Sequence, residues 1–265
     1  MKLRVLRLLA VVSVPALVFA ACGDDDDDAG STTTEAPAEQ SAEGDITAFA
    51  AASLTDAFTE LGTTFESENP DASVEFNFGA SSALREQILA GAPADVFASA
   101  NTSNMDQVVD GGAASDPEDF GTNLLEIAVP AGNEGGVTGL DDFANPDLLI
   151  GLCAEEVPCG EFGREALANA GVTPSIDTNE PDVRSLLTKV EAGDLDAGIV
   201  YVTDVMAAGD TVDGVDIPAD ENVIATYPIA ALTDAANPDT ADAFVAFVLS
   251  DEGQDILQSY GFDAP

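Results

Sequence analysis

Four short turns rich in small or hydroxylated residues could together form an anion-binding site. Ser53 and residues 79–82 follow apolar stretches, and they, like residues 158–160 and 181–182, open stretches with helical periodicity. Helix N-termini present unpaired N–H groups, and open α/β sheets bind ligands beyond the carboxyl ends of their strands. Ser53, with Asp56 three residues later, also fits a helix N-cap with an acidic partner. One such turn more often only caps a helix, but recurrence in two halves of the chain favours an anion site.

Several catalytic chemistries lack their residues. The chain has no histidine, which removes the usual partner of a nucleophilic serine or cysteine and any histidine-based metal site. Neither common form of glycine-rich phosphate loop occurs. Carboxylates are abundant, so an acid pair of the glycosidase kind stays open, but the sequence singles out none.

Residues 1–21 have the features of a secretory signal peptide. A basic start is followed by an apolar run over residues 8–19, which is too short to span a bilayer. Small residues then lead to Cys22, an order that resembles a bacterial lipobox, in which the chain is cut before the cysteine and the cysteine is lipidated. We therefore expect an extracytoplasmic lipoprotein anchored to the cell membrane; an ordinary signal peptide with a chance cysteine is the alternative.

The segment that follows Cys22 differs sharply from the rest. Residues 22–44 hold five consecutive aspartates and then Ser, Thr, Ala, Pro and Glu, with too few apolar residues to pack into a core. We predict a disordered acidic tether over these residues.

Cys153 and Cys159 remain as a pair once Cys22 is assigned to lipidation. In an oxidising compartment a disulfide is the expected state of such a pair. A metal site with Cys-x5-Cys spacing is the rival, although the chain offers no histidine and no second cysteine pair to complete it.

The charge of the chain is strongly negative, with 7 basic and 50 acidic residues. Three basic residues precede residue 22 and eight acidic ones lie in 22–44, so residues 45–265 hold 4 basic and 42 acidic residues, a net charge of −38. Such a surface repels nucleic acid and anionic membranes, which excludes both as partners. It also suggests a saline habitat, where counterions screen the self-repulsion.

Apolar runs alternate with helical patterns through residues 45–265. We expect strands at 46–50, 74–78, 96–100, 124–129, 148–153, 197–201, 223–225 and 229–232. We expect helices at 54–68, 83–90, 104–110, 160–170, 183–192, 205–209, 238–249 and 252–260. This alternation indicates an α/β fold with largely parallel sheets covered on both faces. The 221 residues suffice for one large domain or for two lobes of roughly 100 residues each.

An ordered set of motifs closely resembles the molybdate-binding proteins of bacterial molybdate ABC transporters. The three longest are AAASLTDA, FGASSAL and GAPADVFASA, at residues 50–57, 78–84 and 91–100. VPCG, DVR, GIVY and YPIA follow in the family's order at residues 157–160, 182–184, 198–201 and 227–230, and residues 254–262 complete the set. Each motif alone is weak, but together they cover essentially all of residues 45–265.

This resemblance implies a two-lobed periplasmic-binding-protein fold of the type II kind. Each lobe would be a mixed or parallel sheet flanked by helices, with the ligand in the cleft between the lobes. Residues 45–124 and 228–265 would form the first lobe and residues 125–227 the second.

The resemblance also implies an oxyanion site made of neutral donors. Ser53 and Ser81 would each give a hydroxyl and a backbone N–H, Cys159 and Val183 would give backbone N–H groups, and Tyr201 its phenolic O–H. Molybdenum would be held as molybdate, with no direct metal ligand and no cofactor. Cys159 stands where the family often has a small residue, and a Cys153–Cys159 bond would staple the loop that touches the anion. Arg184 is expected to face away from the site and to form a surface or interlobe ion pair.

The function that follows is a monomeric receptor that captures molybdate, and tungstate as well, for the permease of an ABC transporter. A receptor for another oxyanion, such as sulfate or phosphate, is the leading alternative. An enzyme on the same scaffold is disfavoured because the mapped residues offer hydroxyls and amides but no acid or base. A purely structural lipoprotein is disfavoured by the converging helix starts.

Overall fold

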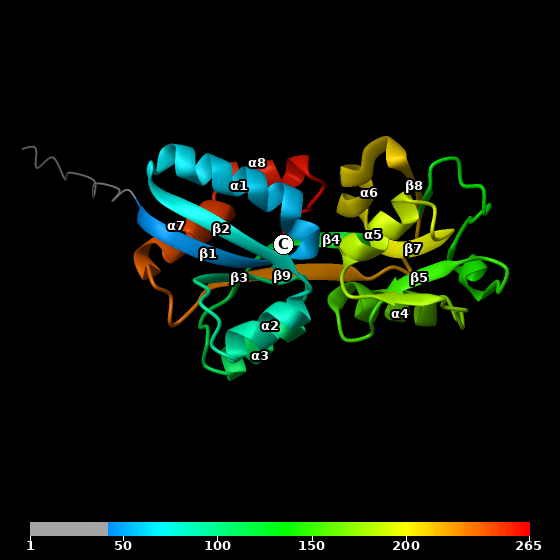
Figure 1. Cartoon of the computed structure of the whole chain (residues 1–265), viewed down its shortest axis with the longest axis horizontal. Coiled ribbons are helices and arrows are strands. Elements are labelled where there is room, and N and C mark those ends of the chain that lie inside the picture. Colours follow the sequence, from blue (N-terminus) through cyan, green and yellow to red (C-terminus); the bar gives the residue numbers. More distant parts are fainter. Residues whose placement is uncertain (1–41) are drawn as a thin grey trace, which may run out of the picture. The chain divides into compact units, whose positions relative to one another are not determined.

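The computed structural model describes residues 42–265 (Figure 1). The predicted signal peptide, Cys22 and nearly all of the predicted tether lie outside the described residues. Among residues 42–265, no helix is both long and apolar enough to cross a membrane.

The first lobe is built on parallel strands. The strand β1 (Glu43–Ala51) pairs in parallel with β2 (Asp71–Gly79) and with β3 (Val96–Ala98), and β9 (Ile224–Ala231) runs antiparallel to β3. Helices cover both faces of this sheet (Figure 1). They are α1 (Thr55–Glu68), α7 (Pro238–Leu249) and α8 (Asp251–Ser259) on one face, and α2 (Ser81–Leu89) and α3 (Thr102–Asp110) on the other.

The two faces of the first lobe have separate apolar contacts. Phe58, Phe65 and Phe244 pack ring to ring between α1 and α7, as part of the main core. Phe97 and Met105 belong to a smaller cluster on the side of α2 and α3. Burial on both faces explains why β3 and the second half of β1 are apolar in continuous runs. The strand β2, at the end of the sheet, instead alternates apolar and polar residues.

The second lobe repeats the arrangement with shorter elements. The strand β5 (Ile150–Cys153) pairs in parallel with β6 (Thr178–Glu180) and with β7 (Ala197–Tyr201). The helices of this lobe are α4 (Pro158–Asn169), α5 (Val183–Glu191) and α6 (Val202–Ala208), and its edge strand is β8 (Val212–Asp216).

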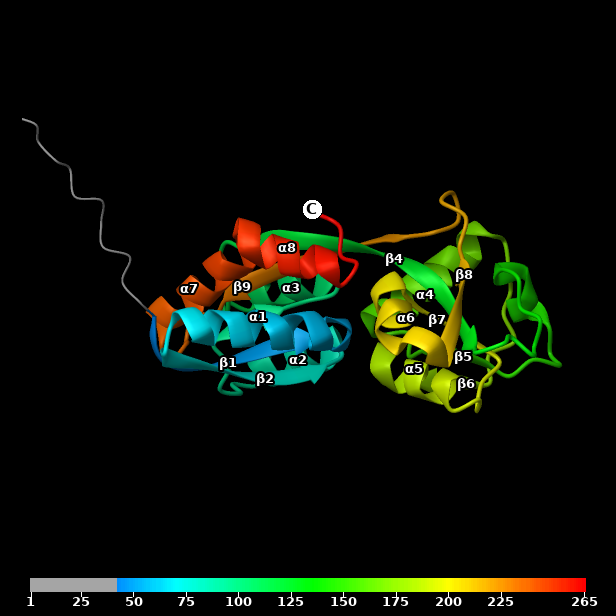
Figure 2. The same cartoon turned by 90° about the horizontal axis from the view of Figure 1, so that it is seen from above.

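The long strand β4 (Glu118–Pro130) carries the chain from the first lobe to the second, and β9 brings it back beside β4 (Figure 2). Residues 118–124 of β4 pair with β9 and its residues 125–130 pair with β7 or β8, so the sheet runs continuously in the order β2-β1-β3-β9-β4-β7-β5-β6. The chain thus forms two lobes within one α/β fold, as predicted. The exact lobe boundaries, 45–124 with 228–265 and 125–227, stay a prediction.

The structure differs most from the sequence-based expectation in four strands, the first of which is β4, expected at 124–129 but beginning at Glu118. The strands β6 and β8 were not expected, because β6 is polar and β8 has two aspartates and a glycine among its five residues. Residues 223–225 and 229–232 were expected as two strands but belong to the single strand β9, which continues through Pro228. Pro228 is tolerated there because it lies at an irregularity in the β4 pairing and its carbonyl accepts the Ser99 N–H at 2.9 Å.

Candidate functional site

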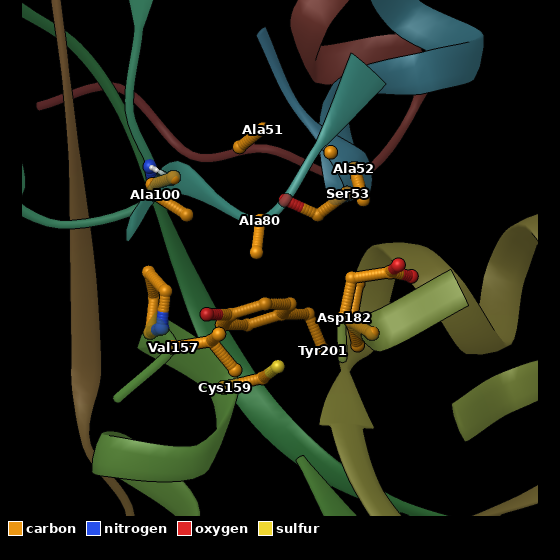
Figure 3. A pocket seen from close by; sticks show the side chains of 13 residues that line it. Ala51, Ala52, Ser53, Ala80, Ala100, Val157, Cys159, Asp182 and Tyr201 are labelled. Carbon is orange, nitrogen blue, oxygen red and sulfur yellow. Dashed lines mark hydrogen bonds between the residues drawn. The ribbon is translucent and has the colours of Figure 1, made fainter. Parts of the chain in front are cut away.

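A small cavity lies between the lobes and is lined by residues of both (Figure 3). Its volume is about 230 Å³, including the part open to solvent. A cavity this small suits a small ion rather than a drug-sized ligand. Its lining residues are Ala51, Ala52, Ser53, Gly79, Ala80, Ser81, Ala100, Val157, Pro158, Cys159, Asp182, Val183 and Tyr201. The structure therefore brings all five residues predicted for the oxyanion site to one cavity.

Ser53 reaches the cavity in a different way from the one predicted. It lies in a 3₁₀ turn (Ala52–Leu54), while the residue that caps α1 is Leu54, which makes no side-chain capping bond. The predicted N-cap role of Ser53 is therefore wrong. Its buried Oγ lies 3.0 Å from the hydroxyl oxygen of Tyr227, and either oxygen can donate. If Tyr227 donates, the Ser53 proton is free for a ligand.

Ser81 is the first residue of α2 and is also buried. Its Oγ accepts the backbone N–H of Ala100 at 2.9 Å. A hydroxyl that already accepts a bond keeps its own proton to donate, so the Ala100 N–H orients Ser81 as a donor. The N–H of Ser81 is among the first of the helix and has no partner one turn back.

Two helix starts form the second-lobe wall of the cavity. The helix α4 begins with Pro158 and Cys159, and α5 begins with Val183. Asp182 caps α5, since its carboxylate accepts from the Ser185 N–H at 2.8 Å, which confirms the predicted cap. The N–H groups of Cys159 and Val183 stand in first helical turns and have no carbonyl one turn back to pair with, so they are available to an anion.

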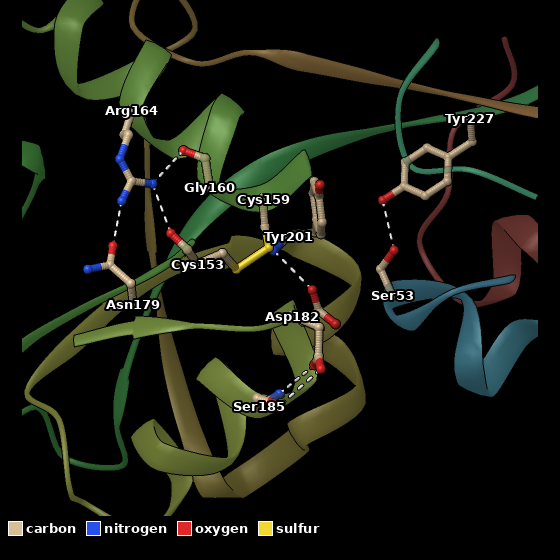
Figure 4. Close-up of a disulfide and its surroundings, with 11 residues drawn as sticks. Ser53, Cys153, Cys159, Gly160, Arg164, Asn179, Asp182, Ser185, Tyr201 and Tyr227 are labelled. Carbon is tan, nitrogen blue, oxygen red and sulfur yellow. Dashed lines mark hydrogen bonds between the residues drawn. A yellow bond between two sulfur atoms is a disulfide. The ribbon is translucent and has the colours of Figure 1, made fainter. Parts of the chain in front are cut away.

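The start of α4 is held by a disulfide and by hydrogen bonds from Arg164 (Figure 4). The sulfur atoms of Cys153 and Cys159 are bonded, which joins the end of β5 to the second residue of α4. Arg164 donates to the carbonyl oxygens of Cys153 and Gly160 at 2.8 and 2.9 Å. A Cβ atom added at Gly160 would lie 1.8 Å from the carbonyl oxygen of Ala154, so only glycine fits at this position.

Tyr201 presents an unsatisfied donor to the cavity. Its side chain is buried, and its hydroxyl has no hydrogen-bond partner among the described residues. Burial raises the pKa of this phenol well above its usual value, and the nearby Tyr227 and Asp204 raise the pKa further, so the hydroxyl stays protonated. An unpaired buried donor costs roughly 1–3 kcal/mol, which an acceptor ligand would relieve.

No cationic residue is among those that line the cavity. Arg184 instead pairs with Asp56 of the first lobe, and its Nε lies 3.2 Å from Oδ1 of Asp204. The expected interlobe ion pair of Arg184 is thus present. Asp204 is fully buried; burial raises its pKa to about 6 against the lowering effects of Arg184 and of the Tyr201 N–H.

Three residues that support the site escaped the sequence-based prediction: Tyr227, Ala100 and Asp204. Tyr227 and Ala100 orient Ser53 and Ser81, and Oδ2 of Asp204 accepts the backbone N–H of Tyr201 at 3.1 Å. Tyr227 and Ala100 stand within the motifs YPIA and GAPADVFASA, which was the available signal. Nothing in the sequence distinguishes Asp204 from the other acidic residues.

The chain is similar to known proteins along nearly the whole of its described length. The family model for bacterial extracellular solute-binding proteins matches residues 46–263. The molybdate-binding protein ModA of Mycobacterium tuberculosis H37Rv is 39% identical over 221 residues, which cover 83% of this chain and 85% of the relative. ModA of Escherichia coli K12 is 35% identical over 233 residues, covering 83% and 89%.

The same likeness holds in three dimensions. The periplasmic molybdate-binding protein of Azotobacter vinelandii superimposes with a TM-score of 0.73 at 18% identity, covering 83% of this chain and 99% of that one. The predicted two-lobed periplasmic-binding-protein fold is thereby confirmed, and so is the resemblance drawn from the motifs.

Proposed function

Because this chain belongs to the family of bacterial extracellular solute-binding proteins, we propose that it captures molybdate outside the cytoplasm and delivers it to an ABC importer. Members of this family are binding proteins rather than enzymes, so the alternatives of an enzyme and of a purely structural lipoprotein are set aside. The ligand is an oxyanion, and no cofactor takes part.

The observation that carries this proposal is the set of neutral donors around one small cavity. The hydroxyls of Ser53, Ser81 and Tyr201 and the helix starts at Cys159 and Val183 are all there, and Tyr201 has no other partner among the described residues. A molybdate dianion only accepts hydrogen bonds, so every one of these groups matches it. Phosphate that carries a proton must also donate, and a shell of donors disfavours it. Tungstate has the same charge and shape and is expected to bind as well.

The test is a ligand panel on the purified full chain. We expect molybdate and tungstate to raise the melting temperature strongly, because a ligand at one hundred times its dissociation constant adds about 2.7 kcal/mol to the free energy of unfolding. Calorimetry with sulfate and phosphate is the matched comparison. Equal or larger effects of sulfate or phosphate would transfer the assignment to the alternative oxyanion.

The remaining parts of the proposal concern the state of the protein. We propose that it works as a monomer, that Cys22 carries a lipid anchor and that Cys153 and Cys159 form a disulfide in the exported protein. Stable attachment requires more than one acyl chain, which lipoprotein processing supplies. In the expressing cell, Cys22→Ala should release the protein from membranes or leave the signal peptide uncut. An unmodified N-terminus elsewhere, found by mass spectrometry, would refute the anchor.

A further inference from the structure

Two polar contacts join the lobes next to the cavity. In the first, Arg184 at the start of α5 pairs with Asp56 in the first turn of α1. In the second, the amide of Asn101 donates to Oε2 of Glu161 at 2.9 Å. Arg184–Asp56 is the only ion pair between the lobes in the described part of the chain.

Each partner stands close in sequence to a residue that lines the cavity. Asp56 follows Ser53 by three residues and Arg184 follows Val183 directly. Asn101 follows Ala100 directly and Glu161 follows Cys159 by two residues. Figure 3 places Ala52 and Asp182 at one end of the cavity and Ala100 and Val157 at the other, so the two contacts adjoin its two ends.

In each contact, one of the two partners also has a polar contact within its own lobe. Arg184 is fixed in the second lobe by the charge of the buried Asp204, whose Oδ1 lies 3.2 Å from Nε. Asn101 is buried in the first lobe, where its Oδ1 accepts the N–H of Asn104 at 3.1 Å. Asp56 and Glu161, the partners across the cleft, are more exposed. Each contact therefore joins a group that its own lobe holds to a more exposed group across the cleft, so the contact can break without disturbing either lobe.

We propose that these two contacts are interlobe clasps that keep the cleft closed and so slow the release of the anion, while none of their four side chains touches the anion. This inference rests on the proposed function for the identity of the ligand. It assigns Arg184 a positioning role, which explains why a base adjacent to a site residue lies outside the cavity lining.

The experiment compares Asp56→Asn and Glu161→Ala with the unaltered full chain. Two of the three tyrosines, Tyr201 and Tyr227, are at the site and the chain has no tryptophan, so tyrosine fluorescence follows molybdate binding and release. Glu60→Gln is the matched control, because Glu60 lies one turn after Asp56 on α1 but accepts from Tyr260 within the same lobe. Asp56→Glu keeps the charge and is the conservative variant.

We expect each clasp variant to release molybdate about three- to fivefold faster with an association rate changed less than about twofold. Glu60→Gln should match the unaltered chain, and Asp56→Glu should restore most of the slow release. The proposal of interlobe clasps would be overturned if Asp56→Asn and Glu161→Ala released molybdate at the rate of the unaltered chain. It would also be overturned if Glu60→Gln accelerated release equally.

Small-angle scattering without ligand separates this inference from the ligand assignment. Clasps that hold the lobes together act without ligand as well, so Asp56→Asn should have a larger radius of gyration than Glu60→Gln in anion-free buffer. Failure of the unaltered chain to bind molybdate or tungstate would defeat the proposed function alone, whereas identical scattering of the two variants would defeat the clasps.

Discussion

The two walls of the cavity are built by different means. In the first lobe, the predicted donors include two side-chain hydroxyls beside the backbone N–H groups of the same serines. Each hydroxyl has one neutral hydrogen-bond partner, Tyr227 for Ser53 and the Ala100 N–H for Ser81. In the second lobe, two of the three predicted donors are backbone N–H groups. The disulfide and Arg164 hold the one at Cys159, Asp182 caps the helix that begins at Val183, and the buried Asp204 holds the backbone of Tyr201. The first-lobe wall therefore depends more on the identity of its side chains. The second-lobe wall depends more on the disulfide and the hydrogen bonds that hold its backbone.

The largest effect that separates the walls is expected at Gly160. In Gly160→Ala the added Cβ would meet the carbonyl of Ala154 at 1.8 Å, so the start of α4 must move. We expect a loss of about 3–5 kcal/mol in the free energy of unfolding and no measurable molybdate binding. Gly163→Ala is the control on the same helix, because its Cβ would lie an ordinary 3.5 Å from Ile199. Similar melting temperatures for the two variants would contradict the dependence of the second-lobe wall on its backbone at the start of α4.

The second prediction concerns pH and Asp204. Its pKa is raised from 3.8 to about 6, so the unfolded chain loses this proton before the folded chain does. The stability that Asp204 contributes is therefore present at low pH and lost as pH rises from about 4 to about 6, by about 3 kcal/mol. The difference in unfolding free energy between the unaltered chain and Asp204→Asn should fall over that range. If the unfolding free energies of the two proteins change in parallel from pH 4 to 7, the pKa of Asp204 is not raised by folding.

The third prediction tests the disulfide in the second-lobe wall. The bond between Cys153 and Cys159 closes a short loop, for which the chain-entropy relation gives about 2–2.5 kcal/mol. The variant with both cysteines changed to serine should lose that much stability and also bind molybdate more weakly, because the bond shapes the start of α4. A reducing agent should lower the melting temperature of the unaltered chain but leave that of the serine variant unchanged. Two reactive thiols in the native exported protein would show that Cys153 and Cys159 are not bonded.

The contrast between the walls also explains what sequence reasoning could find. Strands and helices with apolar periodicity were predicted nearly throughout, because burial on two faces leaves continuous apolar runs. Ser53 and Ser81 were predicted as donors because they stand in the motifs AAASLTDA and FGASSAL. Asp204 was not recognisable, since only its burial separates it from 49 other acidic residues. The strand β8 was missed because its acidic pattern carries no strand signal.

The smallest effects give the sharpest comparison, since one hydroxyl from each wall is removed. Ser81→Ala and Tyr201→Phe should each weaken molybdate binding by about 1.5–2 kcal/mol, roughly 10- to 30-fold, because each removes a donor to a charged acceptor. Their effects on the ligand-free protein should have opposite signs. Ser81→Ala leaves the Ala100 N–H without its acceptor and should lower the melting temperature. Tyr201→Phe removes a buried hydroxyl that has no partner in the described structure and should raise it.

Calorimetry and thermal melts of these two variants, with and without molybdate, give both quantities from one set of samples. A Tyr201→Phe protein that is less stable without ligand would show that this hydroxyl is satisfied within the protein. It would then be a structural group, and the second wall would bind the anion through its backbone alone. Weaker binding combined with higher ligand-free stability can arise only if the Tyr201 hydroxyl is kept unpaired for the anion, because a structural hydroxyl lowers stability when it is lost.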